Sequence, residues 1–286
     1  MEQSVEMLAS HEVIGADIQG VDLSQPVSPA ACATMEAALN ERGVLCVRQQ
    51  HVTAPQYIDF ARRFGDVECL FLTHYAHPEH PEILLVSNIQ EAGRPLGHAD
   101  AGRVWHTDMS STTRPPRLTM LYALEVPHDN GTPLGATHFA SAAAAYARLP
   151  AALKTRLEGL QAVHRVAGRR ARTGTGQHDH ALRAQQPDVL HPVVRTHPVT
   201  GQQCLYVSQG ECAAIAGMED DLAVPLIEEL ATCILQAQLQ YTHTWQVHDI
   251  LMWDNCSVQH LATFDYHWPQ HRRLMHRMTV GGSQPF

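Results

Sequence analysis

Residues 104–126 read VWHTDMSSTTRPPRLTMLYALEV. This stretch joins a His-x-Asp pair, His106 and Asp108, through a short proline-marked turn to a long apolar run that begins at Leu118. Side chains two residues apart on a strand point to the same side, so a strand that ends at this pair would present two ligands to one metal ion. The apolar run predicts a buried strand, which would give the pair a rigid platform.

Strand-like runs recur through the second half of the chain, and several are bounded by Gly or Pro turns. The segment His197-Pro198-Val199-Thr200-Gly201 predicts a hairpin turn between two of them. The predicted strands lie at 118–126, 193–197, 203–207, 241–247 and 277–280. Because strands dominate this half, we expect a mixed α/β fold with a mainly β core, a jelly roll or double-stranded β-helix with flanking helices.

The first third of the chain predicts helices between strands. Ser28 and Pro29 offer an N-cap and a first-turn proline, and apolar residues then recur at helical spacing until Gly43. Thr53 and Gln56 resemble the capping box of a second helix. The other predicted elements are strands at 16–23 and 44–47 and helices at 141–160, with a break at Pro150, and at 224–240.

Composition excludes several classes of function. The 286 residues carry a formal charge of -9 with scattered Lys and Arg, which offers no basic patch for nucleic acid. The N-terminus is acidic, and no apolar run approaches the roughly 18 residues of a membrane span. The seven cysteines form no Cys-x-x-Cys pair, so neither a disulfide framework nor a zinc finger is indicated. We expect a cytoplasmic protein that acts on a small molecule.

One long segment contains almost no bulky apolar side chains. Residues 165–186 include five arginines, three glycines and two histidines, and they cannot contribute much to a core. We expect a flexible loop at about 165–190 within a single domain spanning residues 1–286. The loop has two interpretations, a solvated surface insertion or a lid that closes on a polar substrate.

The His-x-Asp pattern is weak by itself. His-x-Asp/Glu occurs four times among 20 histidines, where about two occurrences would be expected from composition. The two occurrences within 77–82 lie in a proline-rich turn, and the pair His98 and Asp100 lies between glycines. Only His106 and Asp108 lead into a long predicted strand. An isolated histidine is more often structural than a ligand, and composition alone does not change that expectation.

A third ligand must come from elsewhere in the chain. His260 is a candidate, because it follows the apolar-to-polar segment 250–255. Two histidines and one carboxylate on one face of an iron ion leave three coordination positions open, as a reaction that binds both a cosubstrate and dioxygen requires.

Several separated motifs occur in one order along nearly the whole chain. Together they resemble the taurine and 2,4-dichlorophenoxyacetate dioxygenase family of Fe(II)- and 2-oxoglutarate-dependent oxygenases. The motifs are 61–65 (ARRFG), 105–108 (WHTD), 144–150 (AAYARLP), 191–201 (HPVVRTHPVTG), 252–255 (MWDN), His260, 265–266 (DY) and 272–277 (RRLMHR).

The resemblance implies His106, Asp108 and His260 as iron ligands. It also implies that Thr137 and Arg273 hold the distal carboxylate of 2-oxoglutarate, for which a guanidinium fork is well suited. The family's usual Gly-Gly-Asp-Thr appears here as Leu-Gly-Ala-Thr at 134–137, so the threonine is kept without its neighbouring carboxylate.

For the substrate, the resemblance implies that Arg277 faces an anionic group. Asn88 and Trp105 are further expected substrate-binding residues. The implied cofactors are Fe(II), 2-oxoglutarate as cosubstrate, and O2. No membrane or nucleic-acid partner is implied, and the resemblance leaves a homo-oligomer open.

The implied reaction is hydroxylation of a C–H bond coupled to decarboxylation of 2-oxoglutarate to succinate. The expected substrate is a small polar or anionic metabolite, such as an amino-acid-like compound, a sulfonate or a carboxylate. Two alternatives remain. A cupin-like metalloenzyme without 2-oxoglutarate predicts that Arg273 is exposed or paired away from the metal, and a catalytically silent small-molecule binding protein predicts no metal-dependent succinate formation.

Overall fold

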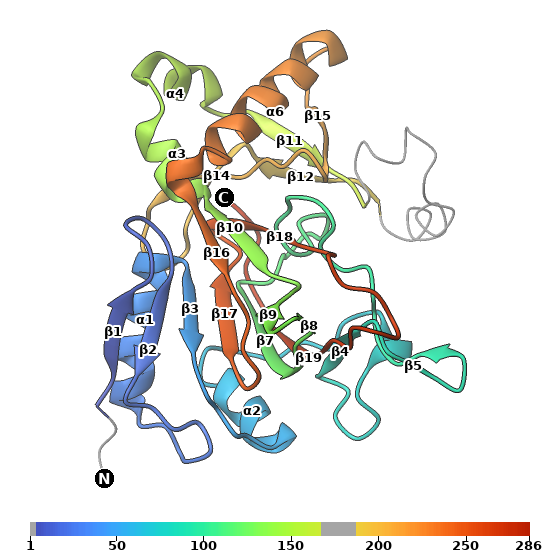
Figure 1. Ribbon diagram of the computed structural model, residues 1–286. Coiled ribbons are helices and arrows are strands. Elements are labelled where there is room, and N and C mark those ends of the chain that lie inside the picture. Colours follow the sequence, from blue (N-terminus) through green and yellow to red (C-terminus); the bar gives the residue numbers. More distant parts are fainter. Residues whose placement is uncertain (1–3, 167–186) are drawn as a thin grey trace.

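A seven-stranded sheet forms the base of the fold in the computed structural model, which describes residues 4–166 and 187–286 (Figure 1). Its neighbouring strands are antiparallel except for the parallel pair β2 and β3. In spatial order the strands are β1 (Glu6–Ala9), β2 (Ala16–Gln19), β3 (Val44–Val47), β17 (Ile250–Asp254), β7 (Leu118–Glu125), β19 (Leu274–Val280) and β4 (Leu84–Ser87). The predicted strands at 16–23, 44–47, 118–126 and 277–280 are thereby confirmed, with shifted ends.

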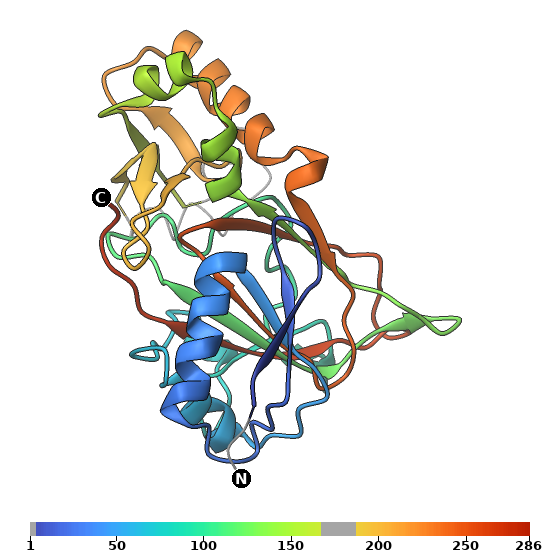
Figure 2. The same cartoon turned by 90° about the vertical axis from the view of Figure 1, so that its left-hand side faces the viewer.

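Two helices cover one face of this sheet, α1 (Pro29–Arg42) and α2 (Ala54–Ala61) (Figure 2). The Ser28 hydroxyl accepts a hydrogen bond from the amide of Ala31, and α1 ends at Gly43 with a φ of 69°. The capping box predicted from Thr53 and Gln56 is present at the start of α2. Apolar side chains of both helices and of the sheet form one core cluster.

A three-stranded sheet shares a second core cluster with the large sheet. This cluster contains several aromatic residues. Phe139 contacts Trp253 of β17, with 5.6 Å between the ring centroids. The strands, in spatial order, are β16 (Gln240–His243), β10 (Thr137–Ser141) and β18 (Val258–Ala262). The predicted strand at 241–247 is thus confirmed in its first half.

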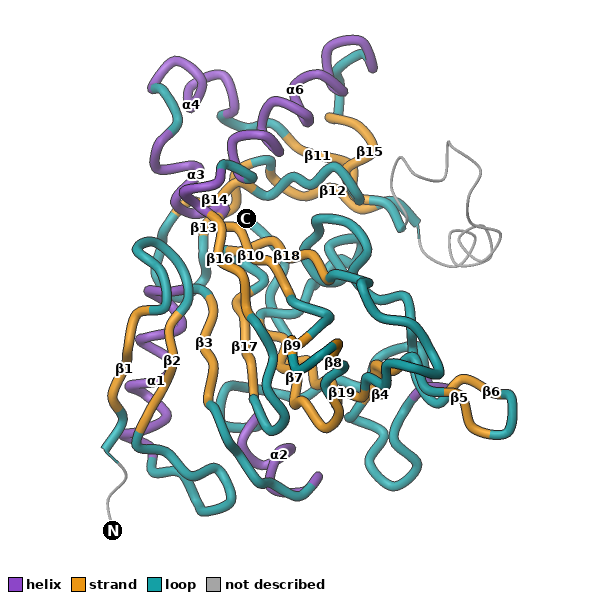
Figure 3. Tube along the Cα trace, viewed as in Figure 1, coloured by secondary structure: helices purple, strands orange, loops and turns teal. Residues whose placement is uncertain are grey.

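Most of the remaining elements gather beyond one end of these sheets, as Figures 1 and 3 show, and enclose a third core cluster. The predicted helix at 141–160 is confirmed with its break, as α3 (Ala142–Arg148) and α4 (Ala151–Leu157). The strands here are β11 (Gln161–His164), β12 (Val189–Pro192), β15 (Cys212–Ile215) and the hairpin of β13 (Val194–Thr196) and β14 (Gln203–Leu205). The predicted hairpin turn at 197–201 joins the last two.

The helix predicted at 224–240 has different ends. It runs as α6 from Asp220 to Ile234 and is followed by the short 3-10 helix η3 (Ala237–Leu239). Two aspartates in its first turn favour the earlier start, because carboxylates stabilise a helix N-terminus. Smaller elements are η1 (Thr73–Tyr75), β5 (Gln90–Glu91), β6 (Arg94–Pro95), β8 (His128–Asp129) and β9 (Thr132–Pro133).

The predicted lid loop at about 165–190 lies mainly outside the described residues, and β12 already begins at Val189. All seven cysteines are free, as expected from their spacing. In the two described ranges, no helix combines the length and the apolar character needed to cross a membrane.

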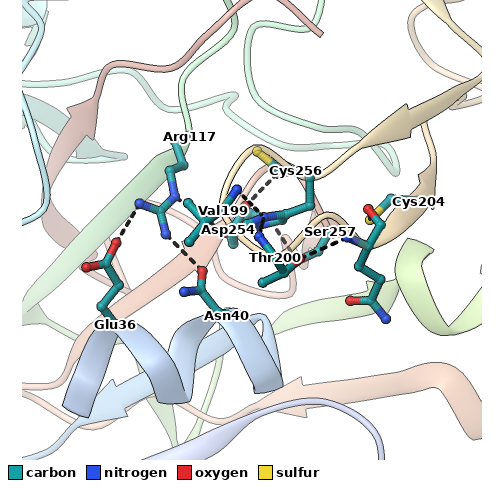
Figure 4. A network of polar contacts seen from close by, with 11 residues as sticks. Glu36, Asn40, Arg117, Val199, Thr200, Cys204, Asp254, Cys256 and Ser257 are labelled. Atoms are coloured by element: carbon teal, nitrogen blue, oxygen red, sulfur yellow. Dashed lines mark hydrogen bonds and ion pairs between the residues drawn. The ribbon is translucent and has the colours of Figure 1, made fainter. Parts of the chain in front are cut away.

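A buried polar network ties two distant sequence motifs together (Figure 4). His197 Nε2 donates to Asp254 Oδ2 at 2.9 Å, while its Nδ1 accepts from the amides of Val199 and Thr200. The other Asp254 oxygen accepts from the amide of Cys256 at 2.7 Å. The network therefore holds the hairpin turn against the end of β17, and both nitrogens of the histidine are engaged by protein groups.

Replacing His197 with alanine is expected to lower the free energy of unfolding by about 3 kcal/mol, because the fully buried Asp254 loses its principal donor. Urea denaturation followed by circular dichroism measures the change. A loss below about 0.5 kcal/mol, the size typical of surface substitutions, would contradict this role.

Candidate active site

Backbone pairing brings two histidines from opposite halves of the chain together. The amide of His106 donates to the carbonyl of His260 at 3.1 Å, and the amide of His260 donates back at 2.9 Å. Residues that exchange both hydrogen bonds lie directly opposite each other, and their rings here are 4.1 Å apart. Asp108 Oδ1 lies 3.7 Å from His106 Nε2 and 3.8 Å from His260 Nε2. The three side chains thus converge on one point.

The expected strand platform is only partly present. His106 forms an isolated bridge with His260 rather than part of a regular strand, and residues 108–111 form a turn. The correction has a physical reason, because the chain must bend after His106 for Asp108 to face both imidazoles. The rigidity comes instead from β18, which carries His260 and pairs with β10.

The donor atoms of the triad suit a divalent cation. His106 Nδ1 lies 2.7 Å from the carbonyl oxygen of Val104, to which only an N–H can donate, so Nε2 carries the lone pair that faces Asp108. Burial lowers the pKa of His260 to about 3 and keeps its ring neutral. Burial alone would raise the pKa of Asp108, but Arg277 and His260 hold it well below its usual range.

Asp108 is oriented through its second oxygen. Oδ2 accepts from the Thr119 hydroxyl at 2.7 Å and from Trp253 Nε1 at 3.2 Å. Asn255 donates to the same hydroxyl at 3.0 Å, which directs the Thr119 hydrogen toward the carboxylate. Because Oδ2 is engaged by these donors, Oδ1 is the oxygen presented to the histidines.

An inner cavity of about 40 Å³ adjoins the triad and is lined by both predicted cosubstrate residues. Thr137 and Arg273 line it together with His106 and His260. Arg273 is 5% exposed, and its Nε has no hydrogen-bond partner among the described residues. The neighbouring Arg272 instead lies at the surface and binds Glu125 at 2.7 Å. The structure thus distinguishes the two arginines of the motif, and the buried one faces the triad.

An outer cavity of about 240 Å³ opens on the other side of the triad. Arg277 lines both cavities, and its Nη2 lies 2.9 Å from Asp108 Oδ1. The remaining lining combines apolar and polar side chains that no sequence motif identified. They include Leu70, Phe71, Leu72, Arg103, Met109 and Glu211, whereas His98, which also lines the cavity, belongs to one of the competing His-x-Asp pairs.

Comparisons with known proteins agree with this arrangement. The sequence profile described as "Taurine catabolism dioxygenase TauD, TfdA family" matches residues 4–279. The chain belongs to this family.

Three relatives illustrate the similarity. The dioxygenase is 31% identical over 260 residues to the alpha-ketoglutarate-dependent 2,4-dichlorophenoxyacetate dioxygenase of Cupriavidus pinatubonensis, covering 87% of this chain and 89% of that one. It is 28% identical to an alpha-ketoglutarate-dependent sulfonate dioxygenase of Saccharomyces cerevisiae, covering 95% and 66% of the two chains. A crystal structure of a taurine dioxygenase from Burkholderia xenovorans matches with a TM-score of 0.82 at 28% identity, covering 99% and 92%.

The protein is therefore a 2-oxoglutarate-dependent dioxygenase that requires Fe(II) and O2, as the family resemblance in its sequence implied. The alternative of a cupin-like enzyme without 2-oxoglutarate expected Arg273 to be exposed or paired away from the metal. Arg273 is instead buried beside two of the three triad residues.

Two predicted substrate residues of the dioxygenase, Asn88 and Trp105, are not among the described residues that line the two cavities. Asn88 instead lines a third cavity of about 260 Å³, which shares Asp100 and Arg103 with the outer one. Trp105 packs against the core cluster of the helical part, 6.4 Å from the ring of His138. The side chain of Asn88 is bound to the backbone of His271 and Arg273. Both remain untested as substrate residues.

Gly135 packs closely against Tyr266 and Arg273. Its φ is 73°, and a Cβ at this position would lie 3.0 Å from the Tyr266 ring and 3.3 Å from Arg273 Nε. Replacing Gly135 with alanine is therefore expected to weaken binding of 2-oxoglutarate about tenfold, through backbone strain and displacement of the guanidinium. Calorimetric titration of the Mn(II)-loaded variant measures this, with Gly131→Ala, where a Cβ meets nothing within 4 Å, as the control for a left-handed glycine. Equal affinities in the two variants would contradict the expectation.

Proposed function

We propose that His106, Asp108 and His260 bind the Fe(II) of this dioxygenase, and that Arg273 and Thr137 bind the distal carboxylate of 2-oxoglutarate. One observation carries the proposal, which is the inner cavity shared by two triad histidines and a buried guanidinium. A buried guanidinium nitrogen without a hydrogen-bond partner is costly, so the unpaired Nε of Arg273 suits a carboxylate that arrives with the cosubstrate.

Each residue contributes a distinct step. With both imidazoles in the neutral form that binds a metal, His106, His260 and anionic Asp108 would offer two nitrogens and one oxygen, the ligand set of iron(II) oxygenases. Arg273 and Thr137 fix the far end of 2-oxoglutarate, so its keto-acid end lies toward the triad. The bound iron supplies the activation of O2, which couples decarboxylation of 2-oxoglutarate to succinate with hydroxylation of a C–H bond. The apolar walls exclude water around the reacting groups.

We also propose a small anionic substrate in the outer cavity, such as a carboxylate or a sulfonate. Arg277 and, beside its ion-pair partner Asp100, Arg103 supply positive charge there, while Leu70, Phe71 and Leu72 supply apolar contacts for the rest of the molecule. Phenoxyacetate and sulfonate in the names of the relatives support this class. An amino-acid-like compound is included, because a carboxylate satisfies the same arginines.

The finer features of the fold follow the same proposal. We propose that the two facing sheets form a jelly roll, or double-stranded β-helix, and that the chain is a single domain. The family profile over residues 4–279 supports one domain. We propose the cytoplasm as the location of the protein, because seven free cysteines suit a reducing compartment. We propose small molecules as its partners. Whether the chain forms a homo-oligomer is left to measurement.

Anaerobic titration of the protein with Fe(II) and then 2-oxoglutarate tests the central assignment. A weak visible charge-transfer band is expected once the keto acid chelates the iron, and it should be absent from Asp108→Ala. Iron binding without a charge-transfer band on addition of 2-oxoglutarate would refute the cosubstrate assignment. Succinate release in the presence of a panel of small carboxylates and sulfonates then identifies the substrate class.

A further inference from the structure

Two residues that follow one another at the end of β4 bind the backbone around Arg273. The Ser87 hydroxyl donates to the carbonyl of Arg273 at 2.8 Å. The side chain of Asn88 accepts from the amide of Arg273 at 2.9 Å and donates to the carbonyl of His271 at 2.8 Å. Both backbone polar groups of Arg273 are therefore satisfied by side chains of this pair.

The position of these contacts in the sheet indicates their structural role. β4 and β19 pair from Leu274 to Arg277, with Ser87 opposite Leu274, so the backbone ladder ends just before Arg273. The side chains of Ser87 and Asn88 extend the pairing across the point where the ladder stops. The serine hydroxyl is itself fixed, because it accepts from the amide of Ile89 at 3.1 Å.

Arg273 has few other restraints. Its guanidinium lies over the Tyr266 ring at 5.7 Å, and no ion pair holds it among the described residues. Arginine binds a carboxylate through the forked nitrogens of its guanidinium group. The position of this group depends on where the backbone is fixed, because a displacement of Cα also displaces the guanidinium. The backbone contacts therefore act together with the packing against Tyr266 to determine where the fork lies.

We infer that Asn88 is a positioning residue for Arg273. Asn88 thereby sets the affinity of the site for 2-oxoglutarate rather than contacting the substrate. Ser87 acts with it. The inference rests on the proposed role of Arg273 at the cosubstrate, and it is an alternative to the sequence-based expectation that Asn88 binds the substrate, which stays untested.

The test compares affinities in the full chain loaded with Mn(II), which does not turn over. Calorimetric titration with 2-oxoglutarate is expected to show about tenfold weaker binding in Asn88→Ala, with the affinity for Mn(II) itself unchanged. Asn88→Asp keeps the acceptor for the Arg273 amide and loses the donor to His271, so it should fall between wild type and Asn88→Ala.

Asn40→Ala is the matched control. Asn40 also makes a side-chain hydrogen bond between separate elements, to Arg117 at 2.9 Å, but this contact lies outside the residues that line either cavity. A general loss of stability would weaken 2-oxoglutarate binding in Asn40→Ala as well, whereas the inference expects wild-type affinity there. Thermal unfolding of each variant identifies any that fail to fold.

The outcomes separate the inference from the function on which it rests. Wild-type affinity for 2-oxoglutarate in Asn88→Ala overturns the inference. If Asn88→Ala does not fold, Ser87→Ala and Asn88→Asp make the same comparison, and wild-type affinity in both overturns it equally. Arg273→Leu is measured in parallel. Normal 2-oxoglutarate binding in that variant refutes the proposed cosubstrate site itself, while a loss there with normal binding in Asn88→Ala refutes only the positioning role.

Discussion

Replacement of Arg273 with leucine is expected to weaken binding of 2-oxoglutarate by about 100-fold, since a bidentate charged contact of roughly 3 kcal/mol is lost. The substitution should not unfold the protein, because the guanidinium forms no ion pair among the described residues and leucine fills part of the same space. Removing an uncompensated buried cation is even expected to raise the unfolding temperature slightly. Titration of the Mn(II)-loaded variant and differential scanning calorimetry measure the two effects.

Arg272→Leu is the control for this substitution. Arg272 has the same side chain one residue earlier, yet it is half exposed and bound to Glu125. We expect no more than a twofold change in 2-oxoglutarate affinity there, because surface ion pairs contribute about 0 to 1 kcal/mol to stability and this one lies away from the inner cavity. A larger effect in Arg272→Leu than in Arg273→Leu would reverse the assignment of the two residues.

Replacement of Asp108 with alanine should abolish iron binding at micromolar concentrations and with it all succinate formation. Two neutral histidines then remain without the only anionic ligand, and Arg277 loses its partner at 2.9 Å. The repulsion between this arginine and an incoming cation adds to the loss, so a decrease in affinity of at least about 100-fold is expected. Equilibrium dialysis with Fe(II) under anaerobic conditions measures it.

Asp100→Ala provides the comparison, because Asp100 belongs to a competing His-x-Asp pair and also lines the outer cavity. Its carboxylate binds Arg103 at 2.6 Å rather than a triad residue. Iron affinity should therefore remain at the wild-type level in this variant. If Asp100→Ala lost iron and Asp108→Ala kept it, the metal site would have to be moved to the loop at 98–100.

The parts of the fold that could be predicted are those determined by local chemistry. The capped ends of α1 and α2 depend on Ser28 and on Thr53 with Gln56, which contact residues only a few positions away. Strands β4 and β17 could not be recognised by alternation, because every residue in both is buried. Their place in the sheet depends on partners far away in sequence.

The site divides in the same way. His106 and Asp108 form a pattern within three residues, and the resemblance to the dioxygenase family supplied His260, Thr137 and Arg273. The outer cavity could not be predicted, because Glu211 and residues 70–72 come from loops without a motif and meet only in the folded chain. Thr119 was likewise missed, since a threonine in a buried strand gives no sign that it orients a carboxylate.

The paired backbone hydrogen bonds between His106 and His260 also determine when the protein can acquire its metal. They close a loop that contains more than half of the chain, so the triad is complete only after these distant segments have met. During synthesis, a chain that has not yet reached residue 260 has only two of the three proposed ligands. We therefore expect the folded protein to be the form that binds iron, and an ion present at 100 times its dissociation constant would then add about 2.7 kcal/mol of stability.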